Sequence, residues 1–406
     1  MATTVTKVID PDMGSGYDYD SLYDWEAAQQ GDLTGARNEI AVAKCRCTAG
    51  TADTTAFTMD GWTTSATQYI KTWTDTSETY RHNGTYQTGN KYRIEISNTN
   101  AIMASEEFVK IIGIQIKCTK SSSSNVRGIC FWFTGDGISY AESCIVVGTG
   151  GDPYSSTDMG GISIYQPPTN SKIFVINCIV YGFTSPTSIS YGFGVSPYYV
   201  NAITYIYNCT LLDNTCGFYS ISSLSYLKNV LLKGNITRDI YHVNTLAAHV
   251  SYCSKSDSYS EFTDDGNNRN SQTFSFVGAA DFHLQASDTG ALGYGLNLYN
   301  DADYPFQTDI DGQDRGGAAA SWDIGADEYV SSAIEQEGFR FRNDDGSESA
   351  ATWKANQDVN INLAADTAFR LRFLLKATGN PDSIDAQAEA RVKPSGGAFG
   401  AWEKIN

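Results

Sequence analysis

The amino-acid sequence predicts an all-β chain whose larger part is a solenoid of stacked coils. A short β-prone phrase recurs at residues 143–146, 177–180 and 208–211, with a degraded copy at residues 229–232. The cysteines of this phrase, Cys144, Cys178 and Cys209, lie 34 and 31 residues apart. A second phrase precedes each copy. Two strand phrases that return in a fixed order once per period are the signature of stacked coils.

The second phrase opens with a glycine followed by an apolar residue. We assign its copies to Gly128-Ile129, Gly161-Ile162, Gly192-Phe193 and Gly217-Phe218. Residues 108–118 form a further strand pattern, which aligns with the cysteine phrase one period earlier. The abundance of Gly, Ser, Thr, Asn and Tyr also favours strands joined by many turns over long helices.

Length and charge bound the function. A chain of 406 residues is long enough for a large core and for two domains. With 28 basic and 46 acidic residues its net charge is −18, which argues against binding of nucleic acid phosphates or of an anionic membrane. No apolar run is long enough to span a bilayer, so no membrane insertion is expected.

The nine cysteines show no paired framework. Cys144, Cys178 and Cys209 share one repeat position, so we expect them to stack about 4.8 Å apart as small buried apolar groups. No histidine shares their register, which leaves little weight for a metal site among them.

The N-terminal residues show no secretory signal, although the composition is typical of proteins that work outside cells. Bacteriophage structural proteins combine these properties, because they fold in the host cytoplasm and meet the outside only after lysis. The expected location is therefore the virion, with the bacterial surface as the alternative.

The chain is divided by texture into four parts. We assign residues 1–37 to an N-terminal cap, 38–330 to the solenoid with its closing motif, 331–337 to a linker, and 338–406 to a small antiparallel β-sandwich. The cap contains a helical pattern over residues 21–30, in which Leu22, Trp25 and Ala28 share a face. An open solenoid end needs such a plug.

Several segments together resemble right-handed parallel β-helix proteins of the pectate lyase-like fold, which are frequent among bacterial surface and phage proteins. They are the opening Ile9-Asp-Pro-Asp, the recurring Asn-Cys phrases, Asp281-Phe-His-Leu284 and the closing Asp323-Ile-Gly-Ala-Asp-Glu328. Residues from Gly338 onward look like an accessory β-domain found beside such helices in phages. Family members include enzymes, tailspikes and adhesins, so the resemblance implies the fold and leaves the activity open.

Carbohydrate-cleaving β-helices need clustered carboxylates or a calcium site beside a basic residue. The acidic residues of the repeats fall in different phases: Asp136, Glu142, Asp158, Asp213 and Asp239. We assign no catalytic residue and expect no cofactor.

Asp309, Asp311 and Asp314 form the one calcium-like run, and they are a weak metal candidate because the spacing departs from the EF-hand pattern. We interpret these carboxylates as acceptors for turn amides and for Arg315. His283 belongs to the closing segment, where we expect a structural hydrogen bond.

A set of tyrosines recurs near the second strand phrase and is the candidate ligand-binding wall. Its members are Tyr165, Tyr198, Tyr199, Tyr219 and Tyr241. Aromatic rings on a solenoid wall can stack on sugars. Packing beneath the long turns is the competing interpretation, and it is favoured because the chain contains 25 tyrosines.

The sequence thus predicts a non-enzymatic bacteriophage virion protein, a tail fibre, spike or capsid-decorating protein that displays a rigid rod for host attachment. The expected partners are two further copies in a homotrimer, other virion proteins, and a host-surface glycan or protein. The alternatives are a polysaccharide lyase or glycoside hydrolase of the same fold, and a bacterial adhesin.

Overall fold

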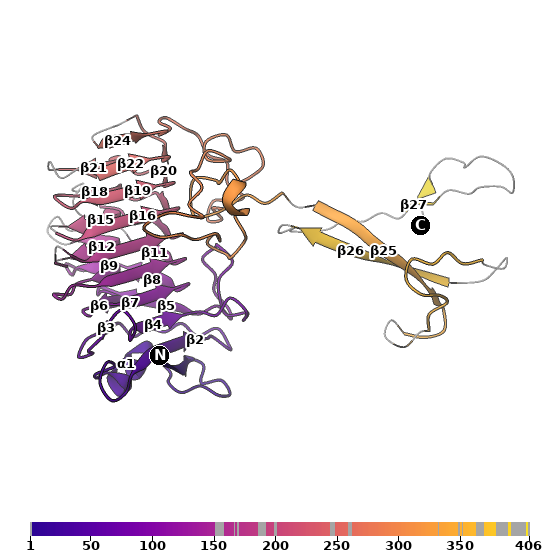
Figure 1. The fold of residues 1–406 in the computed structure, drawn as a ribbon, viewed down its shortest axis with the longest axis horizontal. Helices are drawn as coiled ribbons and strands as arrows, with labels where there is room; N and C mark the ends of the chain where they lie inside the picture. The colour runs from indigo at the N-terminus through magenta and orange to yellow at the C-terminus, as the bar shows by residue number, and fades with distance from the viewer. Residues whose placement is uncertain are drawn as a thin grey trace. The chain divides into compact units, whose positions relative to one another are not determined.

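A computed structural model gives the architecture of the chain (Figure 1), which divides into two compact units, Met1–Tyr329 and Val330–Asn406. The structure describes residues 2–150, 158–165, 167–168, 170–185, 192–198, 201–243, 248–258, 262–331, 333–347, 350, 352–362, 369–378, 389–390 and 403–404. The described chain is nearly all β, as the sequence predicted.

The first unit is built from three parallel sheets that form the sides of a β-helix. Its largest sheet has ten strands: β1 (Thr3–Ile9), β2 (Glu39–Cys45), β4 (Ile70–Trp73), β7 (Val109–Ile112), β10 (Ile138–Glu142), β13 (Lys172–Ile176), β16 (Ile203–Tyr207), β19 (Ser225–Lys228), β22 (Ala248–Ser251) and β24 (Thr263–Gly266). Each later coil adds one strand to this sheet, so the strands follow one another along the solenoid in chain order.

The other two sheets have seven strands each. The β5–β23 sheet contains β5 (Arg93–Ser97), β8 (Gln115–Thr119), β11 (Ile145–Thr149), β14 (Ile179–Tyr181), β17 (Thr210–Leu212), β20 (Leu231–Lys233) and β23 (Ser254–Lys255). The β3–β21 sheet contains β3 (Phe57–Met59), β6 (Ile102–Ala104), β9 (Val126–Phe131), β12 (Met159–Tyr165), β15 (Gly192–Tyr198), β18 (Cys216–Ser220) and β21 (Arg238–His242).

Each regular coil therefore has three strands, whereas the sequence phrases predicted two. The ten-stranded sheet supplies the third. The strand expected over residues 108–118 is in fact two strands, because the chain turns a corner at Gly113, where φ is +69°. Apolar residues on both sides of the corner hid the break.

The second unit contains antiparallel β-structure. Strand β25 (Ala333–Asn343) pairs with β26 (Phe369–Thr378), and β27 (Glu389–Ala390) pairs with β28 (Glu403–Lys404). Strand β25 begins inside the range that the sequence assigned to a linker. Residues 359–362, between β25 and β26, are irregular.

The glycine phrase forms a ladder in the β3–β21 sheet, with one difference from the sequence assignment. Ile162 pairs with Val195, so Gly161 is level with Gly194 and Gly192 lies two residues earlier. Gly192-Phe193 and Gly194-Val195 are two residues apart in one strand, so their side chains point to the same faces of the sheet. The sequence spacing therefore could not tell which of the two pairs aligns with Gly161-Ile162. A side chain at Gly194 would lie 2.7 Å from the carbonyl oxygen of Gly217, which explains why only glycine fits there.

The cysteines form the predicted interior ladder. Cys144, Cys178 and Cys209 are fully buried, and each thiol contacts backbone carbonyl oxygens of its own or the preceding coil. Val230 replaces cysteine on the next coil, as the degraded copy of the phrase indicated. Leu231 pairs with Ser254, so the preceding residues, Val230 and Cys253, are level with each other. Cys253 thus returns cysteine to the ladder one coil after Val230.

The residue before each ladder position turns the corner between the ten-stranded sheet and the β5–β23 sheet. Ser143, Asn177, Asn208 and Asn229 all have φ between +48° and +56°. This left-handed region is unfavourable for most side chains, and asparagine is among the few that tolerate it. The recurrent Asn-Cys phrase is thus a corner followed by a core residue.

These corner asparagines bind the segment that follows the last coil, residues 267–329, which we call the closing segment. The side-chain amide of Asn177 donates to Thr308 O over 2.7 Å. Asn229 makes a paired contact with Leu296, donating to its carbonyl and accepting from its N–H, both over 2.7 Å. These partners are more than sixty residues away in sequence.

The helix α1 (Leu22–Gln29) covers the first coil, as predicted for a cap. Ser21 caps it by accepting the N–H of Asp24. Leu22 and Trp25 are buried, but Ala28 is exposed and Glu26 is buried in its place. The carboxylate of Glu26 accepts the indole N–H of Trp62, which explains why a charged residue lies on the inner face. In the part of the chain that the structure describes, no helix is long and apolar enough to span a membrane.

We predict that Asn229→Ala destabilises the fold more than Asn229→Gly does. Both changes leave the backbone groups of Leu296 without partners, at a cost of about 1–3 kcal/mol. The alanine variant loses about 1–2 kcal/mol more, because alanine tolerates positive φ poorly. Glycine adopts positive φ readily, so the glycine variant has no such additional loss. Urea unfolding of both variants measures the difference. Equal losses of stability in the two variants would contradict the strain at the corner. Wild-type stability in both would contradict a stabilising role of the Asn229–Leu296 hydrogen bonds.

The opening Asp-Pro-Asp ties the cap to the turn after β2. Asp12 accepts the backbone N–H groups of Ala49, Gly50 and Thr51 at 2.6, 3.0 and 3.1 Å. Partial burial acts to raise the pKa of Asp12, but the hydrogen bonds from Thr51, Ala49 and Gly50 outweigh it and lower the pKa to about 2.

We therefore predict a pH-dependent difference between the wild type and Asp12→Asn. The folded-state pKa lies below the unfolded value, so the stabilisation is complete above about pH 4 and is lost as the pH falls towards 2. The wild type is expected to be more stable by about 1 kcal/mol at pH 6, after allowance for solvent screening. Denaturant unfolding at pH 6, 4 and 2.5 tests this. A difference that stays constant over this range would contradict the assigned role.

Candidate functional site

The closing segment covers the outer faces of two of the three sheets (Figure 1). On the β5–β23 sheet, Ile145, Ile179 and Leu231 pack against apolar residues of the segment, including Phe282 and Ile324. On the ten-stranded sheet, Phe174, Tyr205 and Tyr207 pack against Leu298 and Trp322. The closing segment thus lies along these two side walls.

The outer face of the β3–β21 sheet differs, and we call it the open wall. The apolar cluster on it contains only residues of strands β15, β18 and β21 and the turn after β18: Phe193, Cys216, Tyr219, Ile221, Tyr198 and Tyr241. No described residue of the closing segment joins this cluster. Candidate ligand contacts therefore concentrate here.

The open wall carries a continuous ladder of aromatic rings from five coils. Its members, which we call the aromatic ladder, are Trp132, Tyr165, Tyr198, Tyr219 and Tyr241. Successive ring centroids lie 5.1, 5.4, 6.0 and 5.6 Å apart, and the rings are stacked or tilted by no more than 34°. The structure thus brings together four of the five tyrosines that the sequence singled out; Tyr199 lies outside the described residues.

Stacking between the rings determines which ring surfaces of the aromatic ladder a ligand can contact. Rings that lie face to face cover one another, so tyrosines inside the ladder present their edges and not their faces. Tyr219 is only 3% exposed, which makes it a packing residue. At one end of the ladder, the guanidinium of Arg238 lies 5.3 Å from the centre of the Tyr241 ring. Sugar stacking needs a ring face, which these residues supply poorly.

Trp132, at the other end, is the residue that sequence reasoning missed. It is 38% exposed, and among the described residues its aromatic neighbour is Tyr165 on one side only. On its other side lies the chain after β6, since the Trp132 N–H donates to Ala104 O. A signal was present in the sequence, because Trp132, Tyr165 and Tyr198 are spaced by 33 residues twice.

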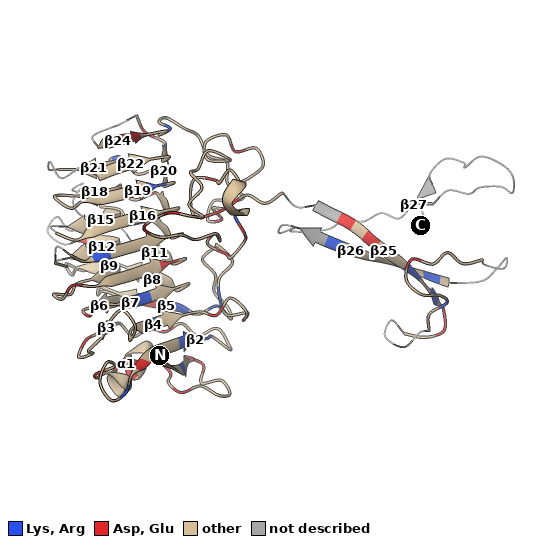
Figure 2. Cartoon of the chain, viewed as in Figure 1, with Lys and Arg blue, Asp and Glu red and all other residues tan. Residues whose placement is uncertain are grey.

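Charged groups border the ladder. Arg127 forms an ion pair with Asp158 over 2.6 Å and lies 5.4 Å from the centre of the Tyr165 ring. Glu106 follows β6, two residues after Ala104, and burial raises its pKa although the Trp62 N–H donates to it. Across the described chain basic and acidic residues are dispersed, with long uncharged stretches in the strands (Figure 2).

The weak metal candidates from the sequence separate in the structure. Asp309 accepts the N–H groups of Asp311, Gln313 and Glu328, which is the turn-amide role that we expected. Asp314 is exposed and accepts the N–H of Gly316. Asp311 is the one of the three that lies beside His283 and Asp327.

Arg315 was expected to pair with these aspartates, and it pairs with Glu328 instead, over 2.9 Å. The guanidinium is buried and also donates to the carbonyl oxygens of Gly325 and Ala326. Burial raises the pKa of Glu328 to about 7, against the lowering effect of Arg315. This contact joins two parts of the closing segment that are 13 residues apart, so its role is structural.

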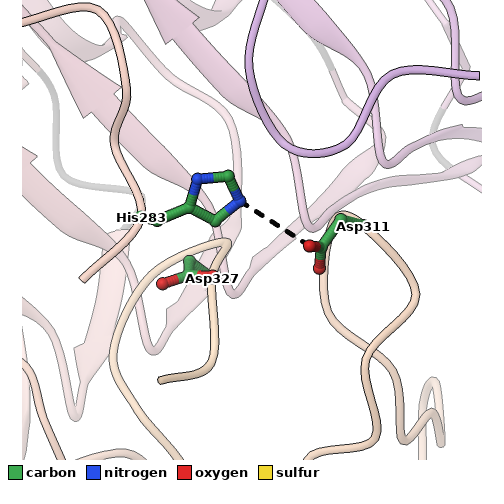
Figure 3. A group of neighbouring side chains, drawn as sticks. All are labelled: His283, Asp311 and Asp327. Carbon is green, nitrogen blue, oxygen red and sulfur yellow. Dashed lines mark ion pairs between the residues drawn. The ribbon is translucent and has the colours of Figure 1, made fainter. Parts of the chain in front are cut away.

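His283, Asp311 and Asp327 lie together in the closing segment (Figure 3). The expected structural hydrogen bond of His283 is present, because its Nδ1 lies 2.5 Å from Asp281 Oδ1. Burial acts to lower the pKa of His283, but Asp311, Asp327 and Asp281 together raise it to about 10. Burial raises the pKa of Asp327 to about 6. Asp327 also accepts the N–H of Leu284.

The three stacked parallel sheets define the class of the first unit as a parallel β-helix. Comparison with protein-family models, with curated proteins and with solved structures gave no match for this chain.

Proposed function

We propose that this protein is a non-enzymatic virion component of a bacteriophage, a fibre, spike or decoration protein, which binds a glycan on the host surface through the open wall. The observation that carries the proposal is the aromatic ladder with Trp132 exposed at one end. A partly exposed indole next to a stripe of tyrosine edges suits an extended sugar chain, with one sugar ring against the indole and its neighbours hydrogen bonded.

The distribution of packing supports this choice of surface. The closing segment packs against apolar residues on the outer faces of the other two sheets, which removes those residues from contact with a ligand. The ion pair of Arg127 with Asp158 borders the ladder with polar groups that can bind hydroxyls. An apolar platform with a few polar groups beside it is the usual composition of a ligand site.

A polysaccharide-cleaving enzyme is the second candidate, favoured by one observation. Glu106 lies after the strand next to β9, and its raised pKa would suit a general acid. Glycoside hydrolysis needs a second carboxylate within about 10 Å on the same site. The carboxylates close enough to raise the pKa of Glu106 are Glu107 and Asp60. Asp158 is held by Arg127, and Asp239 is buried with three hydrogen-bond donors around it.

We predict that Trp132→Ala lowers the affinity for host glycan about tenfold or more, because it removes the exposed stacking face. Trp132→Tyr is expected to retain part of the affinity. The measurement is binding to immobilised capsular polysaccharide and lipopolysaccharide O-chains from candidate hosts. Tyr299→Ala is the matched control, since Tyr299 is 37% exposed but belongs to the closing segment.

Equal binding by the wild type and Trp132→Ala would contradict the site. Release of oligosaccharides by the wild type, abolished in Glu106→Gln, would replace the proposal with the enzymatic alternative. Binding without release is the expected result.

The C-terminal unit supports self-association as a homotrimer. Strand β26 exposes a run of large apolar side chains, Phe369, Leu371, Phe373, Leu374 and Leu375, each between 38% and 48% exposed. A two-stranded sheet is only marginally stable alone, so further strands or copies are needed to cover such residues.

We therefore predict a mass of three 44.2 kDa chains in sedimentation equilibrium. Phe373→Glu is expected to weaken the assembly, because it places charge among the apolar side chains, whereas Tyr23→Glu on the exposed face of α1 leaves it unchanged. A wild-type monomer at micromolar concentration would contradict the trimer.

A further inference from the structure

Three ligand-type atoms meet inside the closing segment. One atom each from His283, Asp311 and Asp327 lie within 4.8 Å of one another, and the Nε2 of His283 lies 3.6 Å from Asp311 Oδ2. In Figure 3 the imidazole of His283 faces the carboxylate of Asp311, and Asp327 lies beside the ring. The three residues come from separate turns of the closing segment.

Two atoms of these residues lack partners, whereas Asp311 Oδ2 accepts from the side-chain amide of Gln313 over 2.9 Å. His283 Nε2 and Asp311 Oδ1 are buried without a hydrogen bond. The Asp311 side chain is only 7% exposed, so water does not readily satisfy it. Orphaned buried polar atoms are rare in folded proteins and point to an unseen partner. A separation of 3.6 Å is too long for a direct hydrogen bond between the imidazole and the carboxylate.

The other side of the imidazole is arranged as in metal sites. Nδ1 of His283 contacts Asp281 Oδ1 over 2.5 Å, which fixes the ring and makes Nε2 more basic. Histidines that bind metals nearly always hold their second nitrogen on a carboxylate or a carbonyl in this way. Gly84 packs against Nε2, where any side chain would clash, since an added Cβ would lie 2.4 Å away.

We propose that His283, Asp311 and Asp327 bind one divalent transition-metal ion, Zn²⁺ or Mn²⁺. Two ligands of a tetrahedral Zn²⁺ lie roughly 3.3–3.6 Å apart, since each bond is about 2.0–2.2 Å. The separation between His283 and Asp311 already matches this, and the widest of the three closes by about 1 Å on binding. One imidazole with two carboxylates suits Zn²⁺ or Mn²⁺ better than Ca²⁺, which prefers oxygen ligands alone.

The ion would have a structural role. It would join three turns of the closing segment that the chain separates by up to 44 residues, from His283 to Asp327. Because this segment covers two walls of the β-helix, the ion would stabilise the native state relative to the unfolded chain. The site is independent of the proposed glycan-binding wall.

The test is calorimetric titration of the full-length, EDTA-treated protein with Zn²⁺, Mn²⁺ and Ca²⁺, together with Tm at each ion. We expect one equivalent of Zn²⁺ or Mn²⁺ to bind saturably and to raise Tm. His283→Gln and Asp311→Asn are expected to weaken binding at least tenfold. Two controls should bind as the wild type does: Asp314→Asn, in the same loop, and His249→Gln, an exposed histidine that also pairs with an aspartate.

The proposal is overturned by wild-type protein that binds neither Zn²⁺ nor Mn²⁺, or by equal binding in His283→Gln and Asp311→Asn. Tighter binding of Ca²⁺ than of both other ions would overturn the assigned class of ion. If the variants do not fold, X-ray absorption of the Zn²⁺-loaded wild type decides. Nitrogen and oxygen ligands support the site, whereas sulfur ligands would place the ion at cysteines instead.

Discussion

The left-handed corner between the ten-stranded sheet and the β5–β23 sheet is the constraint on which the rest of the structure depends. One residue per coil adopts positive φ there, and on three consecutive coils that residue is Asn177, Asn208 or Asn229. The same residue performs two tasks. Its backbone turns the chain so that the next residue enters the core, and its side-chain amide binds the closing segment. Asparagine is the side chain that satisfies both, because it tolerates the conformation and carries a donor and an acceptor.

This double role has a consequence for function. Because the corner directs the closing segment over two walls, the apolar residues on those walls become interior, and stability is gained from their burial. The third wall is left with an aromatic ladder that stabilises itself by stacking between coils. A β-helix clamped in this way is a rigid support, and rigidity lowers the entropy lost when a surface ligand binds. The proposed glycan site thus lies on the open wall. The proposed metal ion lies in the closing segment, which covers the other two walls.

The sequence predicted what repeats and missed what depends on distant contacts. The Cys144–Cys178–Cys209 ladder and the stacked tyrosines were predictable because parallel coils place equal repeat positions in contact. Trp132 was also within reach, at the same spacing as Tyr165 and Tyr198. The sequence could not distinguish Gly192 from Gly194 as the partner of Gly161, because the two glycines are two residues apart and share a face of the strand. The partners of Asn177 and His283 were not predictable, because Thr308 lies 131 residues from Asn177 and no repeat relates the closing segment to the coils.

The most direct test of this account is hydroxyl-radical footprinting of the native protein, with oxidation located by mass spectrometry. Trp132 lies on the open wall, whereas Trp322 belongs to the closing segment and packs against the ten-stranded sheet; their exposures are 38% and 0%. The account predicts rapid oxidation of Trp132 and protection of Trp322 until the protein unfolds. Oxidation of Trp322 as fast as that of Trp132 would show that the closing segment does not clamp its wall, and would contradict the division between covered and open walls.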